Sequence, residues 1–176
     1  MYKKLKPQKT LLLGGAGFIG FNLASYISEH SDYQITIADN LSRGKMDEHL
    51  SSLIRNAKIK FVETDLTDPK SFISLDDDYD QCYMLASVVG VNNTLSVPHE
   101  VIRINTSLIL NTLEWIKNSK VKKVVFTSTS ENYAGTIDKF GYTIPTPEDI
   151  PLSILDISQA GHQPMFSDDK DLTIAY

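Results

Sequence analysis

The sequence has little cysteine, no excess of basic charge and no long hydrophobic run. Its single cysteine, Cys82, excludes an intrachain disulfide framework and indicates a reducing compartment, so we expect a cytoplasmic protein. The formal net charge is −5 without a basic stripe, which argues against a nucleic-acid partner bound through its phosphates. No apolar stretch approaches the roughly 20 residues that cross a bilayer. The apolar run 11–13 is too short for a signal peptide, and we expect no membrane partner.

Clustered metal ligands are missing as well. The four histidines are scattered without a ligand spacing, so we expect no metal site. The acidic run 76–78 is predicted to be a solvated turn before a strand. Cys82 lies in an apolar segment, which favours a buried, inert thiol over a nucleophile.

Strand-like and helix-like segments alternate along most of the 176 residues. The strand-like segments are 9–14, 33–39, 58–64, 80–86 and 121–128, and the helix-like segments are 18–30, 45–55, 69–75 and 98–118. This alternation predicts an α/β fold, a doubly wound (Rossmann) parallel sheet with helices on both faces. We expect residues 1–133 to form a dinucleotide-binding domain and residues 134–176, where the periodicity stops, to form an irregular loop or tail.

A glycine-rich turn separates the first strand-like segment from the first helix-like one. Gly14, Gly17 and Gly20 follow the apolar run 11–13, a pattern typical of a strand that turns tightly into a helix. Such a turn lets a pyrophosphate lie on the helix N-terminus, where backbone N–H groups and the helix dipole favour negative charge. The helix is predicted to be amphipathic, with its apolar residues on one side: Phe18, Ile19, Leu23, Ile27 and Tyr26.

An acidic residue ends the second strand-like segment. Asp39 lies 19 residues past Gly20, close to the spacing expected for a carboxylate that binds the adenosine ribose hydroxyls. A carboxylate there repels a 2′-phosphate, which favours NAD over NADP, although Arg43 is close enough in sequence to offset that repulsion.

The helix-like segment 98–118 is apolar on two sides. Val101, Ile104, Leu108 and Trp115 share one side, and Ile102, Ile109, Leu113 and Ile116 share a neighbouring one. One side suffices to cover a sheet. The second predicts either a homodimer through this helix or burial under another part of the chain.

Taken together, these motifs resemble the extended short-chain dehydrogenase/reductase family, and within it the nucleotide-sugar epimerases and dehydratases of the UDP-glucose 4-epimerase type. The resemblance covers roughly residues 9–157. It implies an NAD cofactor, a nucleotide-sugar substrate and a transient transfer of hydride from the sugar to NAD. The cofactor-binding residues that it implies are Gly14, Gly17, Phe18, Ile19, Gly20, Asp39, Asn40, Ser42, Asp65, Leu66, Leu85, Ala86, Ser87, Asn105 and Thr127.

Some of these residues have a structural reading beside the functional one. The resemblance places Asp65 and Leu66 at the adenine, but Asp65 or Thr67 also suits the cap of a helix that begins near Pro69. It places Asn105 beside the active-site helix, but any asparagine in an apolar helix needs hydrogen-bond partners.

The catalytic pattern of the family is only partly present. Residues 124–133 resemble the fifth strand and its hydroxyl cluster, which makes Thr129 the hydrogen-bond donor to the sugar oxygen; the alternative is that this cluster caps a strand end. The family also needs Tyr-x-x-x-Lys on a helix, and no credible copy is found. Tyr176, the last residue of the sequence, has no lysine after it, so the base is either missing or is Tyr176 in an incomplete setting.

The resemblance stops abruptly after about residue 157. We expect the C-terminal substrate domain to be missing, as a truncation or a changed reading frame would produce. The chain is then an incomplete or inactive fragment of an epimerase or dehydratase. The alternative is a non-catalytic NAD-binding module of the same fold.

Overall fold

The computed structural model describes residues 8–129, 133, 141, 163–164 and 173–174. The chain divides into two compact units, residues 1–89 with 100–127, and residues 90–99 with 128–176. The first unit holds nearly all of the regular structure. In the second, helix α3 (Val91–Ser96) and an antiparallel pair of two-residue strands, β6 (Gln163–Pro164) and β7 (Thr173–Ile174), are described. The boundary predicted at residue 133 stays a prediction.

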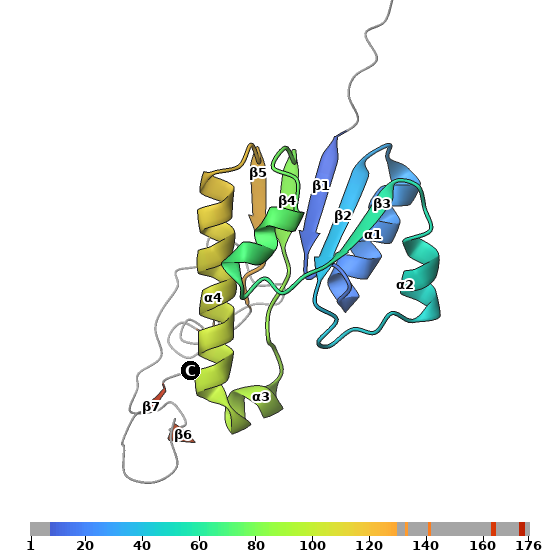
Figure 1. Cartoon of the computed structure of the whole chain (residues 1–176). Coiled ribbons are helices and arrows are strands. Elements are labelled where there is room, and N and C mark those ends of the chain that lie inside the picture. The colour runs from blue at the N-terminus through green and yellow to red at the C-terminus, as the bar shows by residue number, and fades with distance from the viewer. Residues whose placement is uncertain (1–7, 130–132, 134–140, 142–162, 165–172, 175–176) are drawn as a thin grey trace, which may run out of the picture. The chain divides into compact units, whose positions relative to one another are not determined.

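A five-stranded parallel sheet forms the centre of the first unit (Figure 1). Its strands are β1 (Lys9–Leu13), β2 (Gln34–Asp39), β3 (Ile59–Glu63), β4 (Gln81–Met84) and β5 (Lys123–Phe126). The order is β3-β2-β1-β4-β5, and every neighbouring pair is parallel. The chain therefore winds outward from β1 in both directions, which confirms the doubly wound α/β fold and places a topological switch point between β1 and β4.

Helices cover both faces of this sheet. They are α1 (Phe18–His30), α2 (Glu48–Leu53), the 3-10 helix η1 (Pro69–Ser74) and α4 (Pro98–Lys117). On one face, Leu11, Leu13 and Cys82 pack with residues of η1 and α4. On the other, Leu12 and Ile37 pack with residues of α1 and α2. Because successive strand residues point to opposite faces, strands buried on both sides read as continuous apolar runs, as 11–13 does.

The predicted helix face of α1 is wrong at three positions. Phe18 is 87% exposed, and Ile19 and Tyr26 are each 61% exposed. The buried residues of α1 are the small ones, Gly20, Ala24 and Ser28. The fully buried positions of α1 thus carry small side chains, and of the predicted apolar residues only Leu23 and Ile27 are partly buried against the core.

The secondary structure differs from expectation in three further places. The helix predicted over 69–75 is a 3-10 helix, although Pro69 does stand in its first turn as expected. Helix α3 was not predicted, and the strand predicted over 121–128 forms only at 123–126. In contrast, α1 and α4 begin at the predicted residues 18 and 98. The predicted Cys82 environment is confirmed: the thiol is buried, and burial raises its pKa to about 12.

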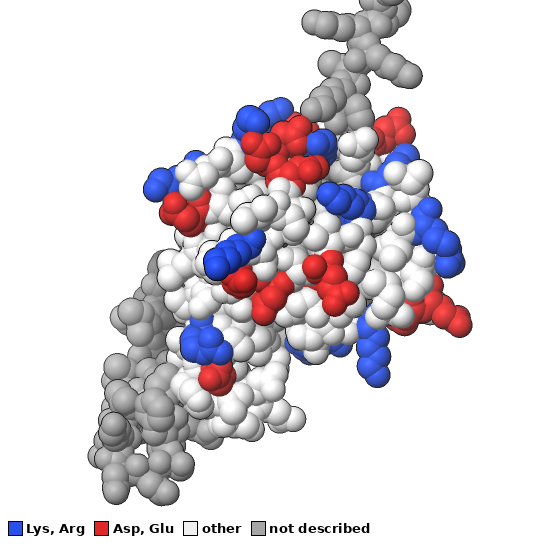
Figure 2. All heavy atoms as spheres, viewed as in Figure 1, with Lys and Arg blue, Asp and Glu red and all other residues white. Residues whose placement is uncertain are grey.

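The acidic run 76–78 is an ion-paired segment rather than a simple solvated turn. Asp76 and Asp78 pair with Lys9, and Asp77 pairs with Lys120 at 2.8 Å. Figure 2 shows the resulting mixture of acidic and basic side chains over this end of the molecule. These contacts tie the loop before β4 to the beginning of β1 and to the segment before β5.

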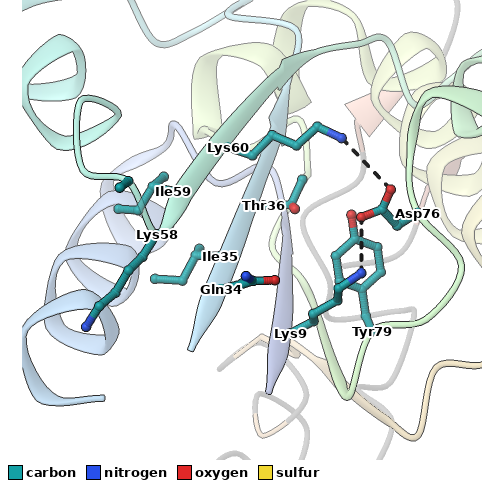
Figure 3. A pocket seen from close by; sticks show the side chains of 10 residues that line it. Lys9, Gln34, Ile35, Thr36, Lys58, Ile59, Lys60, Asp76 and Tyr79 are labelled. Carbon is teal, nitrogen blue, oxygen red and sulfur yellow. Dashed lines mark hydrogen bonds and ion pairs between the residues drawn. The ribbon is translucent and has the colours of Figure 1, made fainter. Parts of the chain in front are cut away.

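A shallow pocket lies at the same amino-terminal ends of the strands, opposite the carboxyl ends (Figure 3). Asp76 lies between the ammonium groups of Lys9 and Lys60, at 3.5 Å and 4.0 Å. Burial raises the pKa of the Tyr79 hydroxyl in its wall. Three lysines, Lys9, Lys58 and Lys60, and one carboxylate, Asp76, line this pocket, and Lys9 is also paired with Asp78 outside the lining.

None of the helices in the described residues is both long enough and apolar enough to cross a membrane. The same residues hold no group of three or more His, Cys, Asp or Glu side chains arranged to bind a metal ion.

Candidate functional site

The glycine-rich turn joins the carboxyl end of β1 to the N-terminus of α1, at the switch point of the sheet. The Gly14 N–H donates to the carbonyl of Ala38 at 2.8 Å, which pins the turn to the end of β2. The Leu85 N–H donates to the carbonyl of Leu13 at 2.8 Å, which holds the segment after β4 on the other side. The turn therefore sits where the strand ends diverge, the position at which doubly wound sheets bind ligands.

Two of the three predicted glycines are required by the packing of the chain itself. Gly14 has φ +79°, a conformation that side chains disfavour, and a Cβ there would lie 2.5 Å from the backbone N of Ala86. A Cβ on Gly20 would lie 2.5 Å from the Cα of Gly15. The first residue allows the tight turn and the third allows the helix to approach the turn closely.

Gly17 differs from these two. It is exposed, its φ is −71°, and the nearest atom to an added Cβ would be the Gly14 carbonyl oxygen at 3.3 Å. The protein itself thus leaves room for a methyl group with only a small adjustment. The chain itself therefore does not require glycine here, and the exposed backbone of Gly17 is accessible to a ligand.

The N-terminus of α1 is open to such a ligand. Gly17 is the N-cap and, because it has no side chain, no side-chain oxygen caps the helix; the first turn carries no acidic residue. The first N–H groups of any helix have no partner within the helix. Here the first N–H groups belong to Phe18 and Ile19, whose side chains are exposed. This arrangement suits the binding of a pyrophosphate at the helix N-terminus.

Asp39 is fixed against the glycine-rich turn. One carboxylate oxygen, Oδ2, accepts a hydrogen bond from the Ala16 N–H at 3.0 Å, and Oδ1 accepts one from the Leu41 N–H at 2.8 Å. The sequence predicted a carboxylate near the turn, and the structure brings the two together across 23 residues. Each oxygen has a further lone pair with which it can accept a hydrogen bond from a hydroxyl group.

The segment after β2 folds back toward the turn. The Asn40 side chain accepts a hydrogen bond from the Ser42 N–H at 3.0 Å, and Leu41 takes φ +55°. A Cβ on Gly44 would lie 3.2 Å from the Ala16 carbonyl oxygen, so the segment also approaches the turn closely. Asn40 and Ser42 are exposed beside Asp39 and are available to a ligand.

The segment after β3 begins beside Asp39, because the Thr64 N–H donates to the Asp39 carbonyl at 2.9 Å. Asp65 is exposed, and its carboxylate accepts hydrogen bonds from the N–H and hydroxyl of Thr67 at 2.9 and 2.8 Å. The helix cap predicted at Asp65 or Thr67 is in fact Asp68, whose side chain accepts from the Lys70 N–H. Asp65 therefore shapes the turn, while Leu66 is buried beneath it.

The segment after β4 is clamped by Asn105 of α4. The Asn105 side chain accepts a hydrogen bond from the Val88 N–H at 2.8 Å and donates one to the Val88 carbonyl at 3.0 Å. The Ser87 hydroxyl also contacts it, at 3.3 Å. Asn105 thus has the hydrogen-bond partners expected of a structural asparagine, and those partners belong to a predicted site segment.

The predicted hydroxyls lie at and beyond the end of β5. The Thr127 hydroxyl donates to the Met84 carbonyl at 3.0 Å, which ties the end of β5 to β4. Thr129 is exposed, three residues past the last residue of β5, in the second unit of the chain. Tyr176 lies outside the described residues. The roles assigned to Thr129 and Tyr176 stay predictions.

Sequence reasoning assigned no role to several residues that shape the site. A Cβ on Gly15 would lie 2.9 Å from Cγ2 of Ile37, so packing of the chain requires glycine at position 15 as well as at positions 14 and 20. In the sequence, the only indication of this role is that Gly15 directly follows Gly14. Asn111 of α4 contacts the segment after β3, and its signal was a polar residue within an apolar helix.

Comparison with known proteins agrees with this geometry. The profile of the NAD dependent epimerase/dehydratase family matches residues 10–153. The chain belongs to this family. The resemblance inferred from the glycine turn, Asp39 and the residues around Thr129 is therefore confirmed.

Individual relatives carry out different reactions. A UDP-N-acetyl-alpha-D-glucosaminuronate decarboxylase of Bacillus cytotoxicus is 35% identical over 126 residues, which are 72% of this chain and 38% of the relative. A CDP-paratose 2-epimerase of Salmonella typhi is 32% identical over 139 residues, 76% of this chain and 40% of the relative. The chain spans well under half the length of these curated relatives.

Solved structures show the same partial coverage. The Bordetella bronchiseptica enzyme WbmF in complex with NAD+ is 30% identical, with a TM-score of 0.62, over 73% of this chain and 38% of WbmF. The cofactor of the family is NAD, and the open N-terminus of α1 beside the fixed carboxylate of Asp39 fits that cofactor.

Proposed function

We propose that this chain binds NAD as the cofactor-binding part of a nucleotide-sugar epimerase or dehydratase. One observation carries the proposal: the Asp39 carboxylate is held 3.0 Å from the Ala16 N–H, between the ends of β1 and β2. That contact supports the proposal, because a dinucleotide site needs a carboxylate for the ribose close to the helix N-terminus that holds the pyrophosphate.

Residues on the β2–β3 side of the turn would hold the adenosine half of the cofactor. The N–H groups of Phe18 and Ile19 bind the pyrophosphate, and Gly17 lets it approach. Asp39 accepts hydrogen bonds from the ribose hydroxyls, with Asn40 and Ser42 beside it. Asp65 and Leu66 line the adenine, because the segment after β3 begins next to Asp39.

Residues on the β4–β5 side would hold the nicotinamide half. Leu85 and Ala86 pack against Gly14, and Ser87 is held by Asn105. Thr127 closes this side at the end of β5. The two halves of the proposed site thus fall on opposite sides of the switch point, as a dinucleotide requires.

When bound, NAD supplies an acceptor for hydride from a sugar carbon. In the proposed reaction Thr129 donates a hydrogen bond to the sugar oxygen that becomes a carbonyl, and so stabilises the charge that develops there. Tyr176 is the candidate base. The relatives named above act on UDP- and CDP-linked sugars, which supports a nucleotide-sugar as the substrate class.

Isothermal titration of the purified chain with NAD and with NADP tests the proposal. We expect NAD to bind and NADP to bind at least about tenfold more weakly, because the Asp39 carboxylate repels a 2′-phosphate. Equal affinities would contradict the role of Asp39. A folded chain that binds neither dinucleotide would overturn the proposed function.

A non-catalytic NAD-binding module is the second candidate. It is favoured by the sequence, in which no credible Tyr-x-x-x-Lys pair follows the hydroxyl cluster. The module and the enzyme both bind NAD, but only the enzyme converts a UDP-hexose. We expect the chain of 176 residues to bind NAD with little or no turnover, and epimerase-level turnover would exclude the module.

A further inference from the structure

Asn111 joins α4 to the segment after β3. Its side-chain nitrogen, Nδ2, donates to the Leu66 carbonyl at 3.1 Å and to the Thr67 carbonyl at 2.9 Å. The two partners lie 45 and 44 residues away in the sequence, so the contact joins elements that the chain does not bring together locally. An amide NH₂ group has two hydrogens, and here each satisfies a different backbone carbonyl.

The same helix holds the next segment of the site in the same manner. Asn105, six residues before Asn111, makes two hydrogen bonds with the backbone of Val88 in the segment after β4. Six residues of α-helix span about 9 Å along the axis. One rigid element therefore fixes two site segments that follow different strands, at a set separation.

A second contact reinforces the first. Trp115, one helical turn after Asn111, packs against Phe72 of η1 with ring centroids 5.6 Å apart. Leu66, between β3 and η1, is 4% exposed and belongs to the same apolar cluster. The chain from Leu66 to Phe72 is thus held to α4 by hydrogen bonds at one end and by aromatic packing at the other.

We infer that Asn111 is a positioning residue for the adenosine half of NAD. It acts through the backbone of Leu66 and Thr67, and it need not touch the cofactor. The inference rests on the proposed function, in which Asp65 and Leu66 line the adenine. Asn105 is the corresponding positioning residue on the nicotinamide side.

Titration of the full chain with AMP and with NAD tests this inference, at a temperature where every variant is folded. Asn111→Ala removes both hydrogen bonds, and we expect it to weaken AMP and NAD by the same factor, about tenfold. A purely structural role would lower the unfolding temperature and leave both affinities unchanged. If the affinities for AMP and for NAD fall by the same factor, the lost contacts are those to the adenosine half of NAD.

Two matched variants sharpen the result. Asn118 directly follows α4. In Asn118→Ala the lost hydrogen bonds are those to Glu114, in the last turn of α4, so both affinities should equal those of the wild-type chain. Asn105→Ala should weaken NAD and leave AMP unchanged, whereas Asn111→Ala should weaken both. The response to AMP therefore separates the two asparagines.

The outcomes are distinguishable. If the wild-type chain binds NAD and Asn111→Ala binds AMP equally well, the inference is wrong while the proposed function stands. If the folded wild-type chain binds neither ligand, both are wrong. If Asn111→Ala fails to fold, hydrogen exchange of the wild-type chain decides: AMP must slow exchange at residues 64–68, and unchanged exchange there in the complex overturns the inference.

Discussion

At the scale of single residues, the glycines of one turn serve different purposes. Gly14 and Gly20 are needed by the fold, since an added Cβ would meet backbone atoms at 2.5 Å. Gly17 is exposed, with room for a Cβ at 3.3 Å from its nearest neighbour. A glycine pattern in a sequence does not separate these roles, because spacing alone says nothing about what each Cβ would meet.

This difference predicts opposite effects of two alanine substitutions. Gly20→Ala should lower the free energy of unfolding by about 2–3 kcal/mol through overpacking. Gly17→Ala should lower it by about 1 kcal/mol or less, yet weaken NAD at least about tenfold because a methyl group obstructs the pyrophosphate. Urea unfolding and NAD titration of both variants measure this. A Gly17→Ala chain with wild-type affinity would contradict the assignment.

The Asp39 carboxylate is predicted to determine the choice of dinucleotide. Asp39→Asn should weaken NAD about tenfold and narrow the gap between NAD and NADP, because the variant no longer repels a 2′-phosphate. Asp32→Asn makes the same change of charge at a side chain that is 97% exposed, and should alter neither affinity. An unchanged ratio of NADP to NAD affinity in Asp39→Asn would refute this role.

At the scale of elements, α4 combines three surfaces. One side packs on the sheet through Leu108 and Trp115, as the sequence predicted, and two asparagines hold site segments. A further side is apolar and exposed: Ile102 is 46%, Leu110 60% and Leu113 56% exposed. The sequence predicted two apolar sides, although Leu110, which was not among the predicted residues, is the most exposed of the three.

We expect the exposed apolar side of α4 to cause self-association. Leu110→Lys places a charge in this surface and should shift the chain toward monomer in sedimentation velocity over a range of concentrations. Asn118→Lys, which adds the same charge in place of a polar residue near the end of the helix, is the matched control. A wild-type chain that is monomeric at every concentration would rule out association through this surface.

At the scale of the whole molecule, three groups have a higher pKa in the folded state than in the unfolded chain. They make the folded protein less stable in alkaline solution. Burial raises the pKa of the Cys82 thiol from 9.0 to about 12, and burial also raises the pKa of Tyr79 above its ordinary 10.0. The hydrogen bond to Asp78 raises the pKa of Lys9 above 10.5. In each case the folded state keeps its proton at a pH where the unfolded chain releases it.

The sign and the pH range follow from linkage. The stability that these groups contribute is complete below their unfolded pKa values and is lost as the pH rises, beginning near pH 9 with Cys82. Between roughly pH 9 and 10 the Cys82 contribution falls by about 1 kcal/mol per pH unit. Urea midpoints at a series of pH values should show a shallower decline for Cys82→Ala. Parallel declines in both chains would refute the role of the thiol.

The sequence by itself determined where β1, α1 and α4 begin, that glycines follow the first strand, and that an acid ends the second. These features are local, because period, turn chemistry and spacing are written in neighbouring residues. Only the tertiary structure decided which Cβ atoms would clash, which side of α1 is buried, and that Asp68 rather than Asp65 caps η1. It also decided that Asn111 meets Leu66 and Thr67, since a contact across more than 40 residues depends on how α4 packs on the sheet.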